Sequence, residues 1–155
     1  MNDNAMTYDS EQDTRQHIEA VQRCMGTIVA QLAHRRAIHD ASKLEPPEKP
    51  MYDKFTPKLR ELVYGSDEYK ATLAEMGPAL QHHYAHNSHH PEHYPNGING
   101  MTLLDLVEMI ADWKAAGLRH SSSSMGKSLE INRTRFGMSD QLFEIFQNTA
   151  RELGW

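Results

Sequence analysis

The amino-acid sequence predicts an all-α protein of about five to seven helices. Apolar residues recur at intervals of three and four over residues 14–39, 103–117 and 139–155, which is the spacing of one helix face. No segment of useful length alternates apolar and polar residues as a strand would. The 155 residues, 39% of them hydrophobic, suffice for one core. We therefore expect a flexible N-terminus over residues 1–12 and a single compact helical domain over residues 13–155.

The first expected helix runs from Thr14 to about His39 and has one apolar face. That face comprises Ile18, Val21, Met25, Ile28, Val29 and Leu32. A straight helix would separate His17 from His39 by about 33 Å at 1.5 Å per residue. The two histidines can bind one ion only if the chain turns back, and we place that turn between Gly26 and Arg36.

Prolines and glycines predict where helices end in the middle of the chain. "EPPEKP", residues 45–50, stops any helix after Leu44, because proline lacks the N–H donor. A short helix should follow and end at Gly65, and Ser66 should cap a second helix over residues 67–86 that Pro78 can kink or end.

Capping residues define the helices of the C-terminal half. Thr102 and Asp105 have the spacing of a capping box, and Gly117 marks the end of that helix. "HSSSSMGKS", residues 120–128, predicts a polar loop, and Ser139 caps the last helix.

Composition narrows the classes of function. The net charge of -5 and thinly spread basic residues give no electrostatic surface for duplex nucleic acid. The single cysteine, Cys24, suits a reducing compartment. The sequence has no signal-peptide pattern and no membrane-length apolar run. We expect a cytoplasmic protein without a membrane partner, and homo-oligomerisation is left open.

The sharpest local motif is "IHDASK", residues 38–43. His39 and Asp40 at a helix end can direct an imidazole nitrogen and a carboxylate oxygen at one metal ion. Lys43 could reach a phosphate oxygen held by that metal. The alternative interpretation of these letters is a polar helix end with a capping role for Asp40.

Six of the ten histidines lie in residues 79–100. On a helix through residues 80–87, His83 shares a face with Leu80 and Asn87, whereas His82 points about 100° away. His83 is therefore the preferred ligand of that helix. His89 and His90 stand outside regular structure, and the sequence alone cannot choose between them. Two further histidines, His86 and His93, are assigned to supporting hydrogen bonds or to solvent.

Asp112 lies in the middle of the clearest amphipathic helix, on one face with Asp105 and Glu108. A solvated acidic stripe is the alternative, but a metal ion would compensate a buried Asp112 carboxylate. We assign Glu108 as a hydrogen-bond partner of a histidine.

Two downstream cations, Arg119 and Lys127, are candidates for binding substrate phosphate, and their loop could close over the site. An ordinary loop followed by a charged helix face is the alternative.

The order of these motifs resembles the HD-domain metal-dependent phosphohydrolases, an all-helical superfamily. "HDASK" looks like the HDxGK of the HD-GYP phosphodiesterases, "HHPEHYPNGING" is similar to their paired histidines and glycine-rich turn, and "MIADWKAA" to their later helix. Small uncharacterised phage-encoded proteins with HDxSK, HHPEH and DWKAA are also similar, over nearly the whole chain. The resemblance implies a metal site built from His17, His39, Asp40, His83, at least one of His89 and His90, and Asp112.

Two departures from the superfamily pattern stand out. Only 22 residues separate His17 from His39, which leaves His34 as a substitute first ligand. "PNGING" is not a GYP motif, so specificity for cyclic dinucleotides does not carry over.

The leading hypothesis is a metal-dependent phosphohydrolase, either a phosphomonoesterase or a phosphodiesterase. A metal-activated water would attack a small nucleotide-like phosphate ester, with Asp40 and Lys43 as the catalytic residues. The ligand count favours two divalent ions, Mn, Fe, Ni, Co or Zn, with Mg also compatible. The alternatives are a non-enzymatic metal-binding or regulatory module and a plain helical protein with surface histidines. A phage-encoded protein would act in the host cytoplasm.

Overall fold

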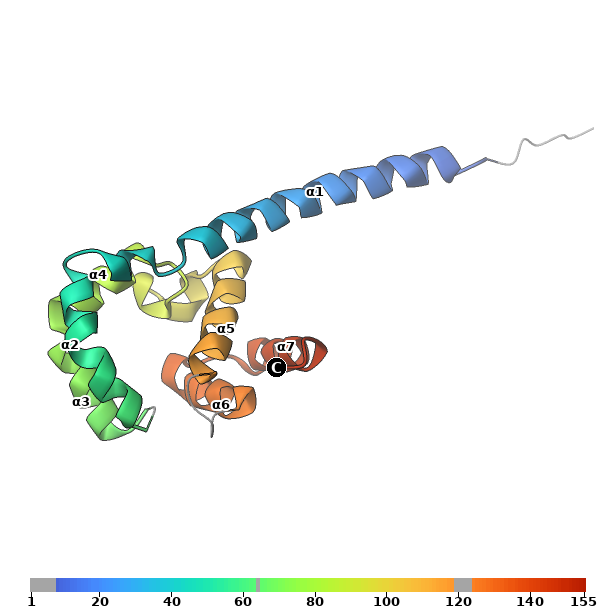
Figure 1. The fold of residues 1–155 in the computed structure, drawn as a ribbon. Coiled ribbons are helices and arrows are strands. Elements are labelled where there is room, and N and C mark those ends of the chain that lie inside the picture. Colours follow the sequence, from blue (N-terminus) through green and yellow to red (C-terminus); the bar gives the residue numbers. More distant parts are fainter. Residues whose placement is uncertain (1–7, 64, 119–123) are drawn as a thin grey trace, which may run out of the picture. The chain divides into compact units, whose positions relative to one another are not determined.

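The computed structural model describes residues 8–63, 65–118 and 124–155. These residues form seven α-helices and three short 3-10 helices and contain no strand (Figure 1), so the all-α prediction is confirmed. The elements are α1 (Glu11–Ile38), η1 (Ala41–Leu44), α2 (Glu48–Glu61), α3 (Asp67–Glu75), α4 (Gly77–His86), η2 (Pro91–His93), η3 (Gly97–Gly100), α5 (Leu103–Gly117), α6 (Met125–Phe136) and α7 (Asp140–Glu152). Within the described ranges, no helix is both long and apolar enough to cross a membrane.

The chain divides into two units, Met1–Ala37 and Ile38–Trp155. The first contains nearly all of α1, and the second contains every other element. A single domain over residues 13–155 stays a prediction.

Helix α1 is one uninterrupted helix of 28 residues. The reversal expected between Gly26 and Arg36 is therefore wrong, because the backbone hydrogen bonds of the helix continue through that segment. None of the α1 residues is buried, so its apolar face is exposed rather than part of a core.

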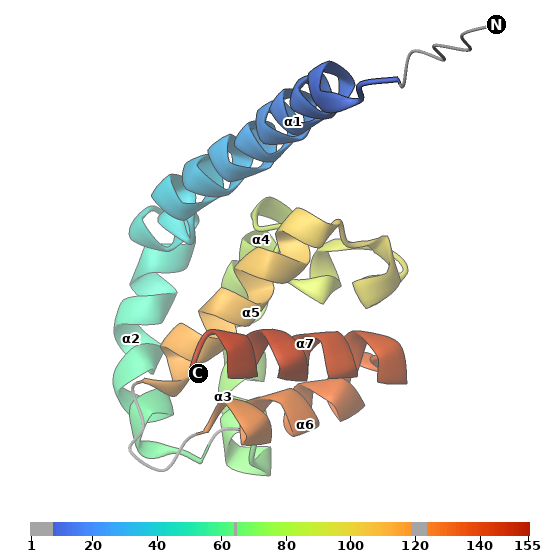
Figure 2. The same cartoon turned by 90° about the vertical axis from the view of Figure 1, so that its right-hand side faces the viewer.

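The core of the second unit lies among α5, α6 and α7, and Figure 2 shows α6 and α7 side by side. Met109 and Ile110 of α5 meet Leu129 of α6 and two phenylalanines of α7, Phe143 and Phe146. Helices α2, α3 and α4 pack on one another, and α2 and α4 also contact η1. Helix α4 carries His83 and is followed by His89 and His90, and α5 carries Asp112.

Most of the expected helix boundaries are confirmed. The side chains of Ser66, Thr102 and Ser139 accept hydrogen bonds from backbone N–H groups in the first turns of α3, α5 and α7. The expected helix over residues 67–86 is divided at Gly77, which has a positive φ of 37°, and Pro78 lies in the first turn of α4.

The expected loop over residues 120–128 is wrong in its second half. Helix α6 begins at Met125, because Ser124 caps it by accepting from the Lys127 backbone N–H. Residues 120–123 lie outside the described residues.

Asp105 joins the start of α5 to the segment that carries the histidines. Its carboxylate accepts hydrogen bonds from Ser88 Oγ at 2.6 Å, Tyr94 OH at 2.7 Å and the Thr102 backbone N–H at 2.8 Å. Asp105 is fully buried. Burial opposes ionisation, but the donors from Ser88, Thr102 and Tyr94 outweigh it and hold the pKa of Asp105 well below its usual range.

Replacing Asp105 with Asn should lower the free energy of unfolding by roughly 2–4 kcal/mol, because buried donors lose a charged acceptor. The depressed pKa means that the contribution of the carboxylate is fully present above about pH 4 and is lost as the pH falls through the folded-state pKa. The difference in free energy of unfolding between wild type and Asp105→Asn should therefore disappear in strong acid. Urea denaturation at several pH values measures this difference. Asp53→Asn, at an exposed ion pair with Lys49, is the control and should change stability by under about 0.5 kcal/mol. Equal stability of wild type and Asp105→Asn would contradict the assignment.

Candidate metal centre

Asp40 stands at the junction between α1 and η1, in the left-handed backbone conformation with φ 57° and ψ 13°. Aspartate and asparagine tolerate this conformation better than other residues with a Cβ atom. Lys43 Nζ lies 2.5 Å from Oδ2 of Asp40. This leaves Oδ1 to face the histidines.

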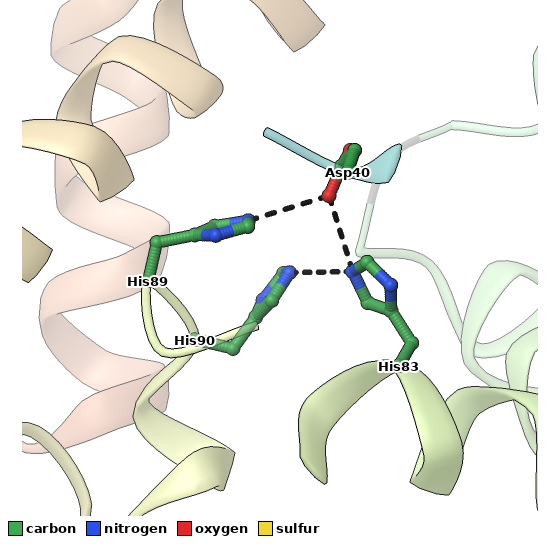
Figure 3. Close-up of side chains that lie close together, drawn as sticks. All are labelled: Asp40, His83, His89 and His90. Carbon is green, nitrogen blue, oxygen red and sulfur yellow. Dashed lines mark hydrogen bonds and ion pairs between the residues drawn. The ribbon is translucent and has the colours of Figure 1, made fainter. Parts of the chain in front are cut away.

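His83 and His89 face Oδ1 of Asp40, and His90 faces His83 (Figure 3). His83 Nε2 lies 3.4 Å and His89 Nε2 3.5 Å from this oxygen. His90 Nε2 is 2.9 Å from His83 Nε2. His83 projects from α4, and His89 and His90 follow the end of that helix. One ligand atom from each of the four residues lies within 4.8 Å of the other three.

Two of these ligand atoms are buried polar atoms that lack a hydrogen bond. Neither Asp40 Oδ1 nor His89 Nε2 has a hydrogen-bond partner among the described residues. Buried polar atoms normally have partners, because an unmade hydrogen bond costs roughly 1–3 kcal/mol. A cation would serve one oxygen and three imidazole nitrogens at once. The residues present therefore fit a metal ion.

A second possible metal position adjoins the first, which is formed by Asp40, His83, His89 and His90. His39, Asp40 and Asp112 form one group of close ligand atoms, and His39, His89 and Glu108 form another. His39 Nε2 lies 3.5 Å from Asp40 Oδ2 and 3.7 Å from Asp112 Oδ1. Asp40 belongs to both the three-histidine group and the Asp112 group. Its two oxygens could therefore face two ions.

The pKa values of His39 and Asp112 show an excess of negative charge at this second position. The nearby carboxylates of Asp112, at 3.7 Å, and Glu108, at 2.9 Å, raise the pKa of His39 to about 10. Burial opposes ionisation of Asp112, but the adjacent His39 outweighs it and lowers the pKa of this carboxyl. A cation is thus stabilised here, either as a protonated imidazole or as a metal ion.

The first position has the opposite character. Burial lowers the pKa of His83, and it lowers the pKa of His90 to about 2. Both rings are neutral at physiological pH, which is the form that binds metals. Lys43 and His39 hold the pKa of Asp40 below its usual range despite burial, so this carboxylate supplies the negative charge.

Glu48 orients the histidines of α4. This fully buried carboxylate, in the first turn of α2, lies 2.7 Å from His82 Nδ1 and 2.8 Å from His83 Nδ1. The hydrogen bond to its Nδ1 leaves His83 Nε2 directed at Asp40, as a carboxylate behind a metal-binding histidine would. Sequence reasoning missed Glu48, because "EPPEKP" indicated only a helix stop; an acidic residue inside a proline cluster was the one available signal.

Glu48→Gln should weaken metal binding by roughly tenfold to a hundredfold, as the loss of a carboxylate behind a ligand histidine does elsewhere. Calorimetric titration of the metal-free protein with Zn²⁺ or Mn²⁺ measures the affinity. Glu61→Gln, at the exposed end of α2, is the matched control. Unchanged affinity in Glu48→Gln would show that the His83–Glu48 pair is structural only.

The structure brings together most of the expected site residues, although their role as ligands stays a prediction. The cluster comprises His39, Asp40, Lys43, His83, His89, His90 and Asp112. Glu108 contacts both His39 and His89, as expected of a histidine partner. His83 and His89 are 1% and 2% exposed, so the interpretation as surface histidines is wrong for them.

The remaining candidates lie elsewhere. His17 and His34 are exposed residues of the first unit. Because α1 is uninterrupted, His17 and His39 of one chain cannot bind the same ion, and any other part of His17 or His34 in a metal site stays a prediction. Lys127 is exposed on α6, and Arg119 lies outside the described residues. His86 and His93 are exposed and direct Nδ1 at the backbone carbonyls of His82 and Tyr84, and a supporting role for them at the metal centre stays a prediction.

Comparison with known protein families identifies the family of the chain. A family model matches residues 6–152, which is nearly the whole length of the chain. The chain belongs to a family of unknown function, DUF5662. Comparisons with curated proteins and with solved structures find no match. The DUF5662 match spans α1 and the whole metal centre, so both features lie within the region that defines the family.

Proposed function

We propose that this DUF5662 chain is a metal-dependent phosphohydrolase that cleaves a phosphate ester of a nucleotide or a similar small molecule. One observation carries the proposal: within a group of three histidines, Asp40 faces the nitrogens of His83 and His89 with one oxygen and Lys43 with the other. A site for metal alone needs no lysine in this place. The ammonium group of Lys43 beside the ligands suits a phosphoryl group, which carries negative charge on its non-bridging oxygens.

Two ions would fit the arrangement. Asp40, His83, His89 and His90 would hold one, and His39, Asp40 and Asp112 the other, with Glu108 steadying His39 and His89. Imidazole nitrogens mixed with carboxylate oxygens suit Mn, Fe, Co, Ni or Zn, and Mg less well. When bound, such ions polarise a phosphoryl oxygen and lower the pKa of a water molecule toward neutrality.

The residues of the chain supply positioning and charge. Lys43 is partly exposed beside Asp40, and its ammonium group lies 5.1 Å from the centre of the Tyr52 ring. Tyr52 thus adds to the Asp40 ion pair in restraining the Lys43 side chain, which favours one placement for a bound phosphate. Glu48 and Glu108 fix the imidazole rings so that little reorganisation accompanies binding. The nucleotide class of the substrate is inferred from the resemblance to HD-domain proteins.

The proposal is tested on untagged, full-length protein. Elemental analysis should find at least one transition-metal ion per chain, and less than about a tenth of an ion would count against the site. Hydrolysis is then measured on phosphomonoesters, phosphodiesters and a nucleotide panel with each divalent ion. Turnover that disappears with a chelator and returns with one metal supports the proposal. A metal-loaded protein that is inert on every substrate would indicate a binding or regulatory module.

A further inference from the structure

Helix α1 carries a narrow apolar stripe that the metal centre does not explain. Its residues follow intervals of three, four, three and four: Ile18, Val21, Met25, Ile28 and Leu32, with the exposed Val29 beside Ile28. Apart from Val29, this is the a and d pattern of a coiled-coil seam, whereas a helix that covers a globular core has a broader apolar face along its length. Met25 is 59% exposed and Ile18 48% exposed. A 28-residue helix without buried side chains has little to stabilise it unless this stripe meets a partner.

The charges at the two ends of the stripe indicate which partner fits. The same intervals continue to Glu11 and Thr14 before Ile18, and to Arg35 after Leu32. The acidic first turn and basic last turn also suit the dipole of the helix, so their presence alone decides nothing. The position of Glu11 and Arg35 on the seam does indicate the direction of pairing, because seam residues of paired helices face one another.

Two copies of α1 could pair in either direction, with different electrostatic results. In a parallel pair, Glu11 would face Glu11 and Arg35 would face Arg35, which is unfavourable at both ends. In an antiparallel pair, Glu11 of one copy faces Arg35 of the other. The same register sets Ile18 opposite Ile28 and Val21 opposite Met25, so four consecutive layers are wholly apolar. Glu11 also pairs with Arg15 of its own helix, but such exposed pairs contribute little.

We propose that α1 is a self-association helix, and that it pairs antiparallel with α1 of a second copy of this chain. The interface consists of the stripe from Ile18 to Leu32, closed at each end by Glu11 and Arg35. This pairing is independent of the metal centre and of the proposed hydrolysis.

Mass measurement on the full chain tests the pairing. Sedimentation velocity and light scattering should find a dimer from low micromolar to several hundred micromolar concentration. Met25→Glu places a carboxylate in the seam of both copies and should raise the dimer dissociation constant at least about a hundredfold. Ala30→Glu adds the same charge on the opposite face of α1 and should leave the dimer unchanged. Circular dichroism checks that helix content is preserved, since Met and Glu have similar helix propensities.

The direction of pairing is tested with a spin label at Gln12→Cys, in a chain whose Cys24 is replaced by Ser. An antiparallel pair sets residue 12 beside residue 34 of the second copy, which separates the labels by about 33 Å along the axis. A parallel pair gives no axial separation, so short distances would overturn the antiparallel assignment. A monomer at every concentration would overturn the proposal. A wild-type monomer whose stability is lowered by Met25→Glu would also overturn it, because the stripe would then pack on the second unit of the same chain.

Discussion

Asp40→Asn is expected to abolish metal loading and, with it, hydrolysis. Asp40 is the one residue shared by the three-histidine group and the Asp112 group, so its charge serves both positions. Loss of a carboxylate that only orients a ligand costs roughly tenfold to a hundredfold in metal affinity, and a shared ligand should cost at least about a hundredfold. Asparagine suits this test because it tolerates the left-handed backbone at residue 40, where alanine would add strain.

Calorimetric titration and elemental analysis measure the loss of metal, and the phosphoesterase assay measures the loss of turnover. Asp53→Asn is the matched control, because Asp53 is an exposed partner of Lys49 on α2. Thermal unfolding of the metal-free proteins shows whether Asp40→Asn still folds. Wild-type metal content in a folded Asp40→Asn protein would exclude the centre described here.

Lys43→Ala is expected to keep the metal and lose turnover. The lysine lies 2.5 Å from Asp40 Oδ2 and lowers the pKa of that carboxyl, but it is not itself a ligand. Its removal frees the carboxylate for an ion, so metal affinity should be unchanged or higher. The rate of hydrolysis should fall roughly a hundredfold to a thousandfold, the usual cost of removing one group that stabilises charge on the transition state.

Two further variants sharpen the result for Lys43. Lys43→Arg keeps the positive charge and should restore part of the activity. Lys49→Ala removes an exposed lysine of α2 and should have no effect. If Lys43→Ala hydrolyses its substrate at the wild-type rate, the lysine serves only to neutralise Asp40, and the phosphate-binding role is wrong.

Self-association through α1 would add a second level of organisation without altering these results. The stripe from Ile18 to Leu32 and the metal centre lie in different units. Met25→Glu should therefore change the mass of the particle while leaving metal content intact. Asp40→Asn should do the reverse.

The sequence by itself determined the helices and several of their ends. Local chemistry explains this success: intervals of three and four define a helix face, and Ser66, Thr102 and Ser139 supply oxygen to backbone N–H groups a few residues away. It also selected His83 over His82, because the face of a short helix depends only on the 100° step between residues.

Only the tertiary structure decided which side chains meet. Residues 39–43, 83–90 and 108–112 are far apart in the chain, and their convergence depends on how α4 and α5 pack around the junction at Asp40. Glu48 could not be assigned beforehand, because its role arises from burial against α4 rather than from its neighbours in sequence. The same limit applies to α1. Its apolar stripe was recognisable in the sequence, but such a stripe indicates only that the surface needs a partner and does not identify the partner. Periodicity and capping act within one or two helical turns, whereas ligand sets and interfaces are fixed by contacts between distant segments.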